Sequence, residues 1–275
     1  MDHLPNTITL SVGTYEVYVL RDGIYRMPSH HIMHARGDAA RQAAYDRWGK
    51  AELVFDVNCF ALSGPGGLTL IDTGAGDMDG PDCGNAALAL RDAGFRPEDV
   101  TNILLTHLHS DHFGGLFDGE AARFPNAIVH IPLAEMPGQQ GGSAAEKAWA
   151  QKCGPRLERI RSAYGDRLRS FGFGPALPGI DAVALPGHTP GHSGFLVHDD
   201  RRSLLIWGDI VHVQGLQLAD PEVGMDYDID TAAALHSSMR AMQTAAREGW
   251  YVAGSHIVGI HHITELDGGF ALVQA

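Results

Sequence analysis

The chain has 275 residues, 44% of them hydrophobic, and its 33 acidic and 20 basic side chains give a formal charge of −13. That charge repels phosphate backbones, so nucleic acids are not expected as partners. No stretch approaches the roughly 18 uninterrupted apolar residues of a membrane helix, which argues against a membrane partner.

The first third of the chain predicts paired strands followed by a helix. The predicted strands have turn residues at their ends and span residues 8–10, 15–20, 53–62 and 68–71. A helix is expected from Asn85, its N-cap, to Ala93, with Gly94 ending it.

Residues 27–50 interrupt this pattern and are predicted to be an insertion. His30, His31 and His34 precede an Ala-rich, helical stretch. We expect these histidines to be surface or interface residues rather than a third metal site, since no carboxylate completes the set. Insertions of this kind cover an active site or form a dimer contact, and a homodimer is therefore considered.

An apolar strand at residues 103–106 leads directly into the sequence HLHSDH, residues 107–112. Three imidazoles and a carboxylate within six residues suit a divalent ion, which takes about four nitrogen or oxygen ligands. His107 and His109 alternate by two, so an extended chain sends both rings to one side. Asp111 and His112 follow where the chain turns into a helix, and they suit a second ion beside the first.

A second insertion is predicted near residues 133–175. Ser143 and Glu146 form a capping box that starts one helix, and another is expected to begin near Pro155. The arginines between residues 156 and 169 alternate with acidic residues and are expected to form a solvated helix face.

Three large aromatic side chains near these motifs are candidates for an apolar substrate pocket. They are Phe113, Phe117 and Trp149. Ordinary core packing is the alternative for each of them.

Three later segments repeat the order of an apolar strand followed by a histidine or aspartate. Residues 182–185 precede a loop with His188 and His192, residues 204–207 precede Asp209, and residues 251–253 precede His256. Between the last two, a helix is predicted from Asp230 to Glu248, ended by Gly249.

The order HxHxDH, GHTPGH, GD and SH, preceded by Asp72, resembles the metallo-β-lactamase superfamily of hydrolases. The resemblance implies one metal ion held by His107, His109 and His188. It implies a second held by Asp111, His112 and His256, with Asp209 and a water or hydroxide between the two. Asp72 would accept a hydrogen bond from a ligand, and His192 would support the site without binding metal. Asp111 is also expected to orient the hydroxide.

Single positions narrow the resemblance. Asp209 stands where the well-known lactam-cleaving zinc enzymes carry a cysteine, and residues 208–221 are similar to methyl parathion hydrolase and its relatives. Small acyl-homoserine lactonases place a tyrosine where this chain has His212. His212 is expected to act as a proton donor or substrate contact, with a packed histidine on the strand after the site as the alternative.

The expected fold is an αββα sandwich of two mixed β-sheets flanked by helices, formed by one domain over residues 1–275. The expected function is that of a metal-dependent hydrolase with two divalent ions acting on small neutral esters, either organophosphate triesters or lactones. A β-lactam hydrolase and a metal-binding scaffold without turnover are the alternatives. Zinc suits the imidazole-rich set best, with manganese, cobalt and iron as alternatives.

The cellular location is predicted from the N-terminus and the cysteines. No secretory signal is visible at the first residues. Cys59, Cys83 and Cys153 lack CxxC spacing and are expected to be reduced thiols. Both observations favour a cytoplasmic protein.

Overall fold

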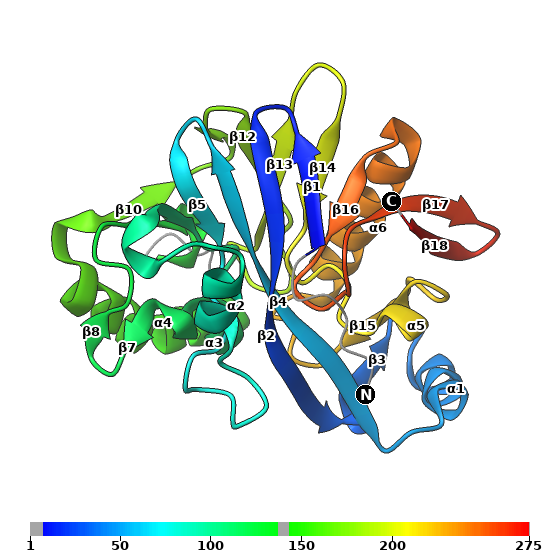
Figure 1. Cartoon of the computed structure of the whole chain (residues 1–275). Helices are drawn as coiled ribbons and strands as arrows, with labels where there is room; N and C mark the ends of the chain where they lie inside the picture. Colours follow the sequence, from blue (N-terminus) through cyan, green and yellow to red (C-terminus); the bar gives the residue numbers. More distant parts are fainter. Residues whose placement is uncertain (1–7, 137–142, 275) are drawn as a thin grey trace.

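Two seven-stranded sheets pack face to face in the computed structural model, which describes residues 8–136 and 143–274 (Figure 1). The first sheet has the order β1-β2-β4-β5-β6-β9-β10. Its strands are β1 (Ile8–Val12), β2 (Tyr15–Pro28), β4 (Glu52–Gly64), β5 (Gly67–Ile71), β6 (Val100–Leu104), β9 (Ile128–Pro132) and β10 (Leu168–Phe171). The hairpins predicted at its N-terminal end are confirmed.

The second sheet has the order β11-β12-β13-β14-β16-β17-β18. Its strands are β11 (Gly174–Leu177), β12 (Ile180–Ala184), β13 (Ser193–His198), β14 (Ser203–Ile206), β16 (Tyr251–Ala253), β17 (His261–Leu266) and β18 (Gly269–Gln274). Both sheets contain parallel and antiparallel pairs, so the predicted mixed sheets are confirmed.

Helices cover the outer faces of the sandwich (Figure 1). The first sheet carries α2 (Ala86–Asp92), α3 (Ser110–Phe113) and α4 (Ala144–Tyr164), and the second carries α6 (Thr231–Glu248). Strand alternation explains the layers, because Leu204 and Ile206 of β14 face the other sheet while Leu205 faces α6. The structure therefore confirms the αββα sandwich.

A small lobe extends from the long ends of β2 and β4 (Figure 1). It contains β3 (Ile32–His34), α1 (Asp38–Trp48), α5 (Gln214–Gln217) and β15 (Val223–Met225), and β3 pairs with β15. The lobe has its own apolar core, formed by residues such as Ile32, Leu53, Phe55 and Val213. The predicted insertion at residues 27–50 is most of this lobe.

The second predicted insertion differs from expectation. One helix, α4, continues through Pro155, because Trp149, Cys153, Leu157 and Ile160 form an apolar stripe that is buried on both sides of the proline. The helix packs on the first sheet in the cluster that also contains Phe113 and Phe117. This segment is therefore a structural layer rather than a cover of the metal-ligand cluster.

The arginines after residue 155 are not simply a solvated helix face. Arg156 donates to the carbonyl oxygen of Leu108, and Arg167 donates to those of Phe124 and Ala127. A short hairpin lies beside this helix, with strands β7 (Phe117–Asp118) and β8 (Ala121–Ala122). In the described part of the chain, no helix has the length and apolar character needed to cross a membrane.

Candidate metal centre

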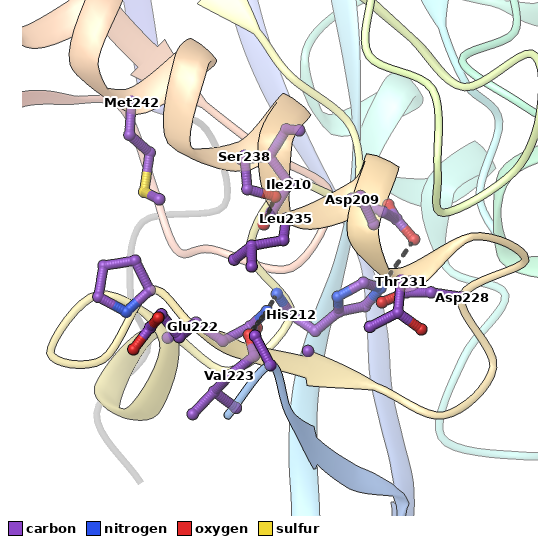
Figure 2. A pocket seen from close by; sticks show the side chains of 15 residues that line it. Asp209, Ile210, His212, Glu222, Val223, Asp228, Thr231, Leu235, Ser238 and Met242 are labelled. Carbon is purple, nitrogen blue, oxygen red and sulfur yellow. Dashed lines mark hydrogen bonds and ion pairs between the residues drawn. The ribbon is translucent and has the colours of Figure 1, made fainter. Parts of the chain in front are cut away.

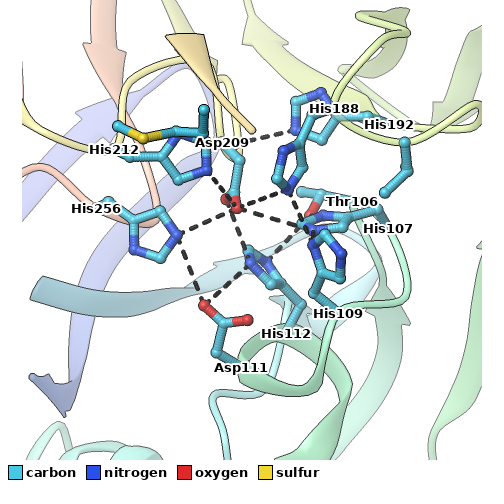
Figure 3. Close-up of polar contacts among 12 residues, drawn as sticks. Thr106, His107, His109, Asp111, His112, His188, His192, Asp209, His212 and His256 are labelled. Atoms are coloured by element: carbon cyan, nitrogen blue, oxygen red, sulfur yellow. Dashed lines mark hydrogen bonds and ion pairs between the residues drawn. The ribbon is translucent and has the colours of Figure 1, made fainter. Parts of the chain in front are cut away.

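Strand ends bring the predicted ligands to one place. His107 and His109 follow β6, Asp111 and His112 lie in α3, and His188 follows β12. Asp209 comes after β14, and His256 after the neighbouring parallel strand β16. Figure 3 shows these side chains converging on the carboxylate of Asp209.

The first group of side chains contains three imidazoles. Nδ1 of His109 lies 2.9 Å from Nε2 of His107 and 2.9 Å from Nε2 of His188. Asp209 completes the group, and the four ligand atoms all lie within 4.8 Å of one another. This is the donor set that a tetrahedral zinc site uses.

The second group contains one carboxylate and two imidazoles. Oδ2 of Asp111 lies 3.5 Å from Nε2 of His112 and 3.6 Å from Nε2 of His256. Oδ1 of Asp209 is 3.2 Å from His112, and Oδ2 is 3.1 Å from His256. Asp209 therefore contacts both groups, since its Oδ2 is also 3.2 Å from His188.

The orientations of three rings show that the cluster fits cations. Nδ1 of His112 lies 2.8 Å from Asp72, Nδ1 of His188 lies 2.9 Å from Asp228, and Nδ1 of His256 lies 2.8 Å from the carbonyl oxygen of Asp56. Those oxygens accept hydrogen bonds, so Nδ1 donates in each ring.

In the neutral form each of these rings consequently presents the lone pair of Nε2 to Asp209. Lone pairs facing a carboxylate repel it unless a cation lies between them. Nε2 of His112 and Oδ1 of Asp209 are buried and have no hydrogen-bond partner among the described residues. The residues present therefore fit a pair of divalent metal ions.

The pKa values of three rings also indicate that the cluster favours positive charge. Burial lowers the pKa of His188, but Asp209 and Asp228 outweigh it and raise the pKa to about 9. Burial likewise opposes the charged form of His112 and His256, yet the pKa of each is raised, chiefly by Asp209. Burial holds the pKa of His107 and His109 well below the ordinary value, so these two rings stay neutral.

Residues behind the cluster fix its geometry. Asp72 accepts from the backbone N–H of Thr106 at 2.8 Å and from its hydroxyl at 2.9 Å. Asp72 has φ 57°, the one positive φ among the described non-glycine residues, so the backbone is strained where this carboxylate is held. His192 donates to the carbonyl oxygen of Leu185, and its Nε2 accepts from the N–H of Asp209 at 3.0 Å.

A family comparison agrees with this geometry. A family model described as the metallo-beta-lactamase superfamily matches residues 53–256. The chain belongs to the metallo-β-lactamase superfamily. The predicted subgroup around methyl parathion hydrolase stays a prediction.

Individual relatives are similar to the chain over different lengths. The probable metallo-hydrolase Rv2300c of Mycobacterium tuberculosis is 32% identical over 177 residues, which are 54% of each chain. The chain thus spans about half the length of this relative. The N-acyl homoserine lactonase AttM of Agrobacterium fabrum is 27% identical over 207 residues, covering 66% of this chain and 70% of AttM.

Solved structures of the superfamily match the whole fold. The hydrolase AbOPH has a TM-score of 0.84 and 25% identity, over 100% of this chain and 99% of that one. AidC, described as a dizinc quorum-quenching lactonase, has a TM-score of 0.82 and 24% identity over the same shares. At this identity the second match shows the fold alone.

A cavity of about 370 Å³ opens onto the metal-ligand cluster. The small lobe and the segment after it supply its wall, with Tyr25, Met27, His31, Phe55 and Tyr227. Phe113, Phe117 and Trp149 do not line this cavity. Trp149, on α4, and the two phenylalanines are buried in one apolar cluster, as the core-packing alternative has it, and the pocket role gains no support from this cavity.

His212 lies in a loop after β14, not on a strand. Its Nε2 is 3.4 Å from Oδ2 of Asp209, and it lines the large cavity. His212 also lines a small pocket of about 30 Å³ between the small lobe and α6, which Figure 2 shows. Both ring nitrogens are buried without a hydrogen-bond partner among the described residues. Its predicted proton role stays a prediction.

The histidines of the first insertion have different environments. His31 lines the large cavity, with Nδ1 2.8 Å from Asp226. His34 is buried beside Asp220 and Glu222, so it is not a surface residue, and the premise that no carboxylate lies near these histidines is wrong. Both of these carboxylates form ion pairs with arginines, however. Arg47 lies 2.6 Å from Asp220, and Arg36 lies 2.8 Å from Glu222.

Two acidic residues that support the site were not predicted from the sequence. Asp228 orients His188, and Glu135 is a fully buried carboxylate behind the first group. Neither follows an apolar strand with a recognisable motif. Glu135 does lie just beyond β9, the strand next to β6, and that position is the one feature by which it could have been found.

Proposed function

We propose that this protein is a two-metal hydrolase that opens lactones. The observation that carries the proposal is the position of Asp209. Its carboxylate lies within 3.1 to 3.8 Å of five imidazoles and contacts both candidate metal groups. A carboxylate in this place would hold two ions together at the floor of a cavity large enough for a small ester.

The bound metal pair would supply a nucleophile at neutral pH from water and would polarise the ester oxygen. His107, His109 and His188 would hold one ion, and Asp111, His112 and His256 the other. The chain's own residues fix the rings from behind, as Asp72 does for His112. Asp111 and His212 line the cavity beside Asp209, and we assign proton handling to them.

The lining of the cavity favours a neutral substrate. No lysine or arginine is among its described lining residues, and Asp79, Asp111 and Asp209 carry negative charge. A substrate with a phosphate or carboxylate group would find no counter-ion apart from the metals. Tyr25, Met27, Phe55 and Tyr227 suit an apolar substituent.

The similarity to the lactonase AttM supports lactones, including N-acyl homoserine lactones, as the substrate class. The cavity also supports a second candidate. A neutral organophosphate triester presents an electrophile of the same charge, and the same metal pair would serve its hydrolysis.

The test compares three substrates on the purified protein after its metal content has been measured. We expect hydrolysis of N-hexanoyl homoserine lactone that a chelator abolishes and that added zinc restores. A nitrophenyl phosphotriester tests the second candidate, and a cephalosporin tests β-lactam hydrolysis. A protein that binds two metals yet hydrolyses none of the three would be a metal-binding scaffold, and the proposal would fail.

A further inference from the structure

A buried carboxylate lies behind the two loops that hold the first candidate metal group. Glu135 ends the short 3-10 helix Leu133–Glu135 after β9, and its side chain is fully buried. Oε2 accepts from the backbone N–H of Leu108 at 3.2 Å and from Nε1 of Trp149 at 3.1 Å. Oε1 accepts from the hydroxyl of Thr189 at 2.6 Å and from the N–H of Gly191 at 2.8 Å.

These four donors belong to three separate parts of the chain. Leu108 lies between His107 and His109, while Thr189 and Gly191 follow His188. One carboxylate therefore joins the loop that carries two rings of the group to the loop that carries the third. No cationic side chain forms an ion pair with Glu135 among the described residues, so the hydrogen bonds are what hold it.

The peptide of Leu108 is held from its other side as well. Its carbonyl oxygen accepts from Arg156 of α4, whose guanidinium lies 5.2 Å from the ring centre of Trp149. Trp149 in turn contacts the ring of His109 edge to face, at 4.9 Å between ring centres. Helix α4 thus supports both the backbone and one imidazole of the first group.

The other loop approaches Glu135 closely. A Cβ atom at Gly191 would lie 2.7 Å from Cγ of Glu135 and 2.8 Å from its Oε1. Only glycine lets this loop come near enough for its N–H to reach the carboxylate. The distance between the two loops is therefore set by contact with Glu135 on both sides.

We propose that Glu135 is a positioning residue for the metal centre, and that with Trp149 and Arg156 it sets the 2.9 Å approach of His109 to His188. The inference rests on the proposed function, because it presumes that these rings bind a metal ion. It predicts that Glu135 controls metal affinity without touching the metal.

The variant Glu135→Gln separates this role from simple packing. The amide oxygen of the glutamine can accept hydrogen bonds from Leu108 and Trp149. The hydroxyl of Thr189 can turn to accept one from the amide nitrogen. The N–H of Gly191 cannot accept, so it loses its partner. The loop of His188 should loosen while the loop of His107 and His109 stays held.

Chelator competition of the zinc-loaded protein measures the two dissociation constants. We expect Glu135→Gln to weaken the binding of one zinc ion by about 10 to 100-fold, the range for residues that orient metal ligands. The binding of the other zinc ion should be unchanged. The visible spectrum of the cobalt-substituted protein should change in the same variant. Trp149→Phe and Thr189→Ala each remove one bond to the carboxylate and should show the same effect more weakly.

Tyr164→Phe is the matched control. Its hydroxyl is a buried donor on α4, the helix of Trp149, and lies 2.7 Å from the carbonyl oxygen of Leu116. Among the described residues, it forms no hydrogen bond with either loop. We expect this variant to lower the thermal midpoint and to keep both zinc affinities and the cobalt spectrum. If Glu135→Gln does not fold, Trp149→Phe and Thr189→Ala carry the test.

The outcomes separate the two proposals. Wild-type protein that binds no metal would overturn the proposed function. Wild-type protein that binds two metals, with variants that lose stability as Tyr164→Phe does but keep both affinities, would overturn the role of Glu135 alone.

Discussion

Oδ1 of Asp228 lies 2.9 Å from Nδ1 of His188 and fixes that ring so that its Nε2 faces His109 and Asp209. The other oxygen of Asp228 accepts from the N–H of Met225 in β15, at 3.2 Å. The small lobe is thereby linked to a candidate metal ligand.

Replacing this carboxylate should weaken metal binding. In Asp228→Ala, His188 loses the partner that sets its tautomer, and we expect one zinc dissociation constant to rise by about 10 to 100-fold. Chelator competition measures it. Asp226→Ala is the control, because Asp226 pairs with His31 at the cavity wall and not with a ligand. Equal effects of both variants would contradict the specific role of Asp228.

Removing the shared carboxylate should have a larger effect. We expect Asp209→Ala to bind one metal fewer per chain and to lose at least about 100-fold in kcat, because several kcal/mol of charge stabilisation depend on the metal pair. Elemental analysis and lactone hydrolysis measure these effects, and circular dichroism checks the fold. Full activity in this variant would rule out the bridging role.

His212 is tested by a change that keeps an aromatic ring and removes its nitrogens. We expect His212→Phe to keep both metals and to lower kcat by about 100-fold or more, the range for a group that transfers a proton. The pH profile of kcat should also lose one limb. An unchanged rate and profile would make His212 a packing residue.

The metal-free protein should have a pH-dependent stability. Burial opposes the charged form of His188, but its carboxylate partners raise the pKa to about 9, against roughly 6.5 in the unfolded chain. Because the pKa of His188 is higher in the folded chain, protonation of this ring stabilises the fold fully below about pH 6.5. This contribution disappears as the pH rises through 9. Urea unfolding should therefore show a decreasing free energy of unfolding over this window.

Metal loading should remove this decrease in stability with pH. Ions compete with protons for the imidazoles, so their affinity rises with pH. We expect the zinc-loaded protein to keep its free energy of unfolding between pH 6.5 and 9. A parallel decrease in both forms would mean that groups outside the cluster cause it.

The thiols should be unreactive in the native protein. All three cysteines are free and buried, and burial raises the pKa of Cys83 and of Cys153 to about 12. At pH 8 a disulfide reagent should modify none of them until denaturant is added, when three should react. Rapid modification of the native protein would show that a thiol is accessible.

The sequence was informative wherever a local pattern determined the outcome. Apolar runs with turn residues at their ends located the strands. A histidine or aspartate soon after a strand located the ligand segments, because strand ends meet at one edge of the sandwich. The helix from Asp230 was predictable too, since Asp230 caps it and Gly249 ends it in the left-handed conformation.

Features that depend on contacts between distant segments were not predictable. Continuation of α4 through Pro155 could be predicted only by knowing that residues on both sides of the proline are buried against one sheet. Trp149 and Phe113 carry no indication of whether they face a core or a cavity. Asp228 is 40 positions from the ring that it orients, and Glu135 is 54 positions from Thr189.

The separate apolar core of the small lobe has a consequence for how this enzyme class diversifies. The candidate metal ligands come from strand ends of the sandwich, whereas the cavity wall at Met27, His31 and Phe55 belongs to a lobe with its own interior. We therefore expect substitutions in this lobe to change substrate selectivity while the metal-ligand cluster stays intact, so a library aimed at new esters belongs there.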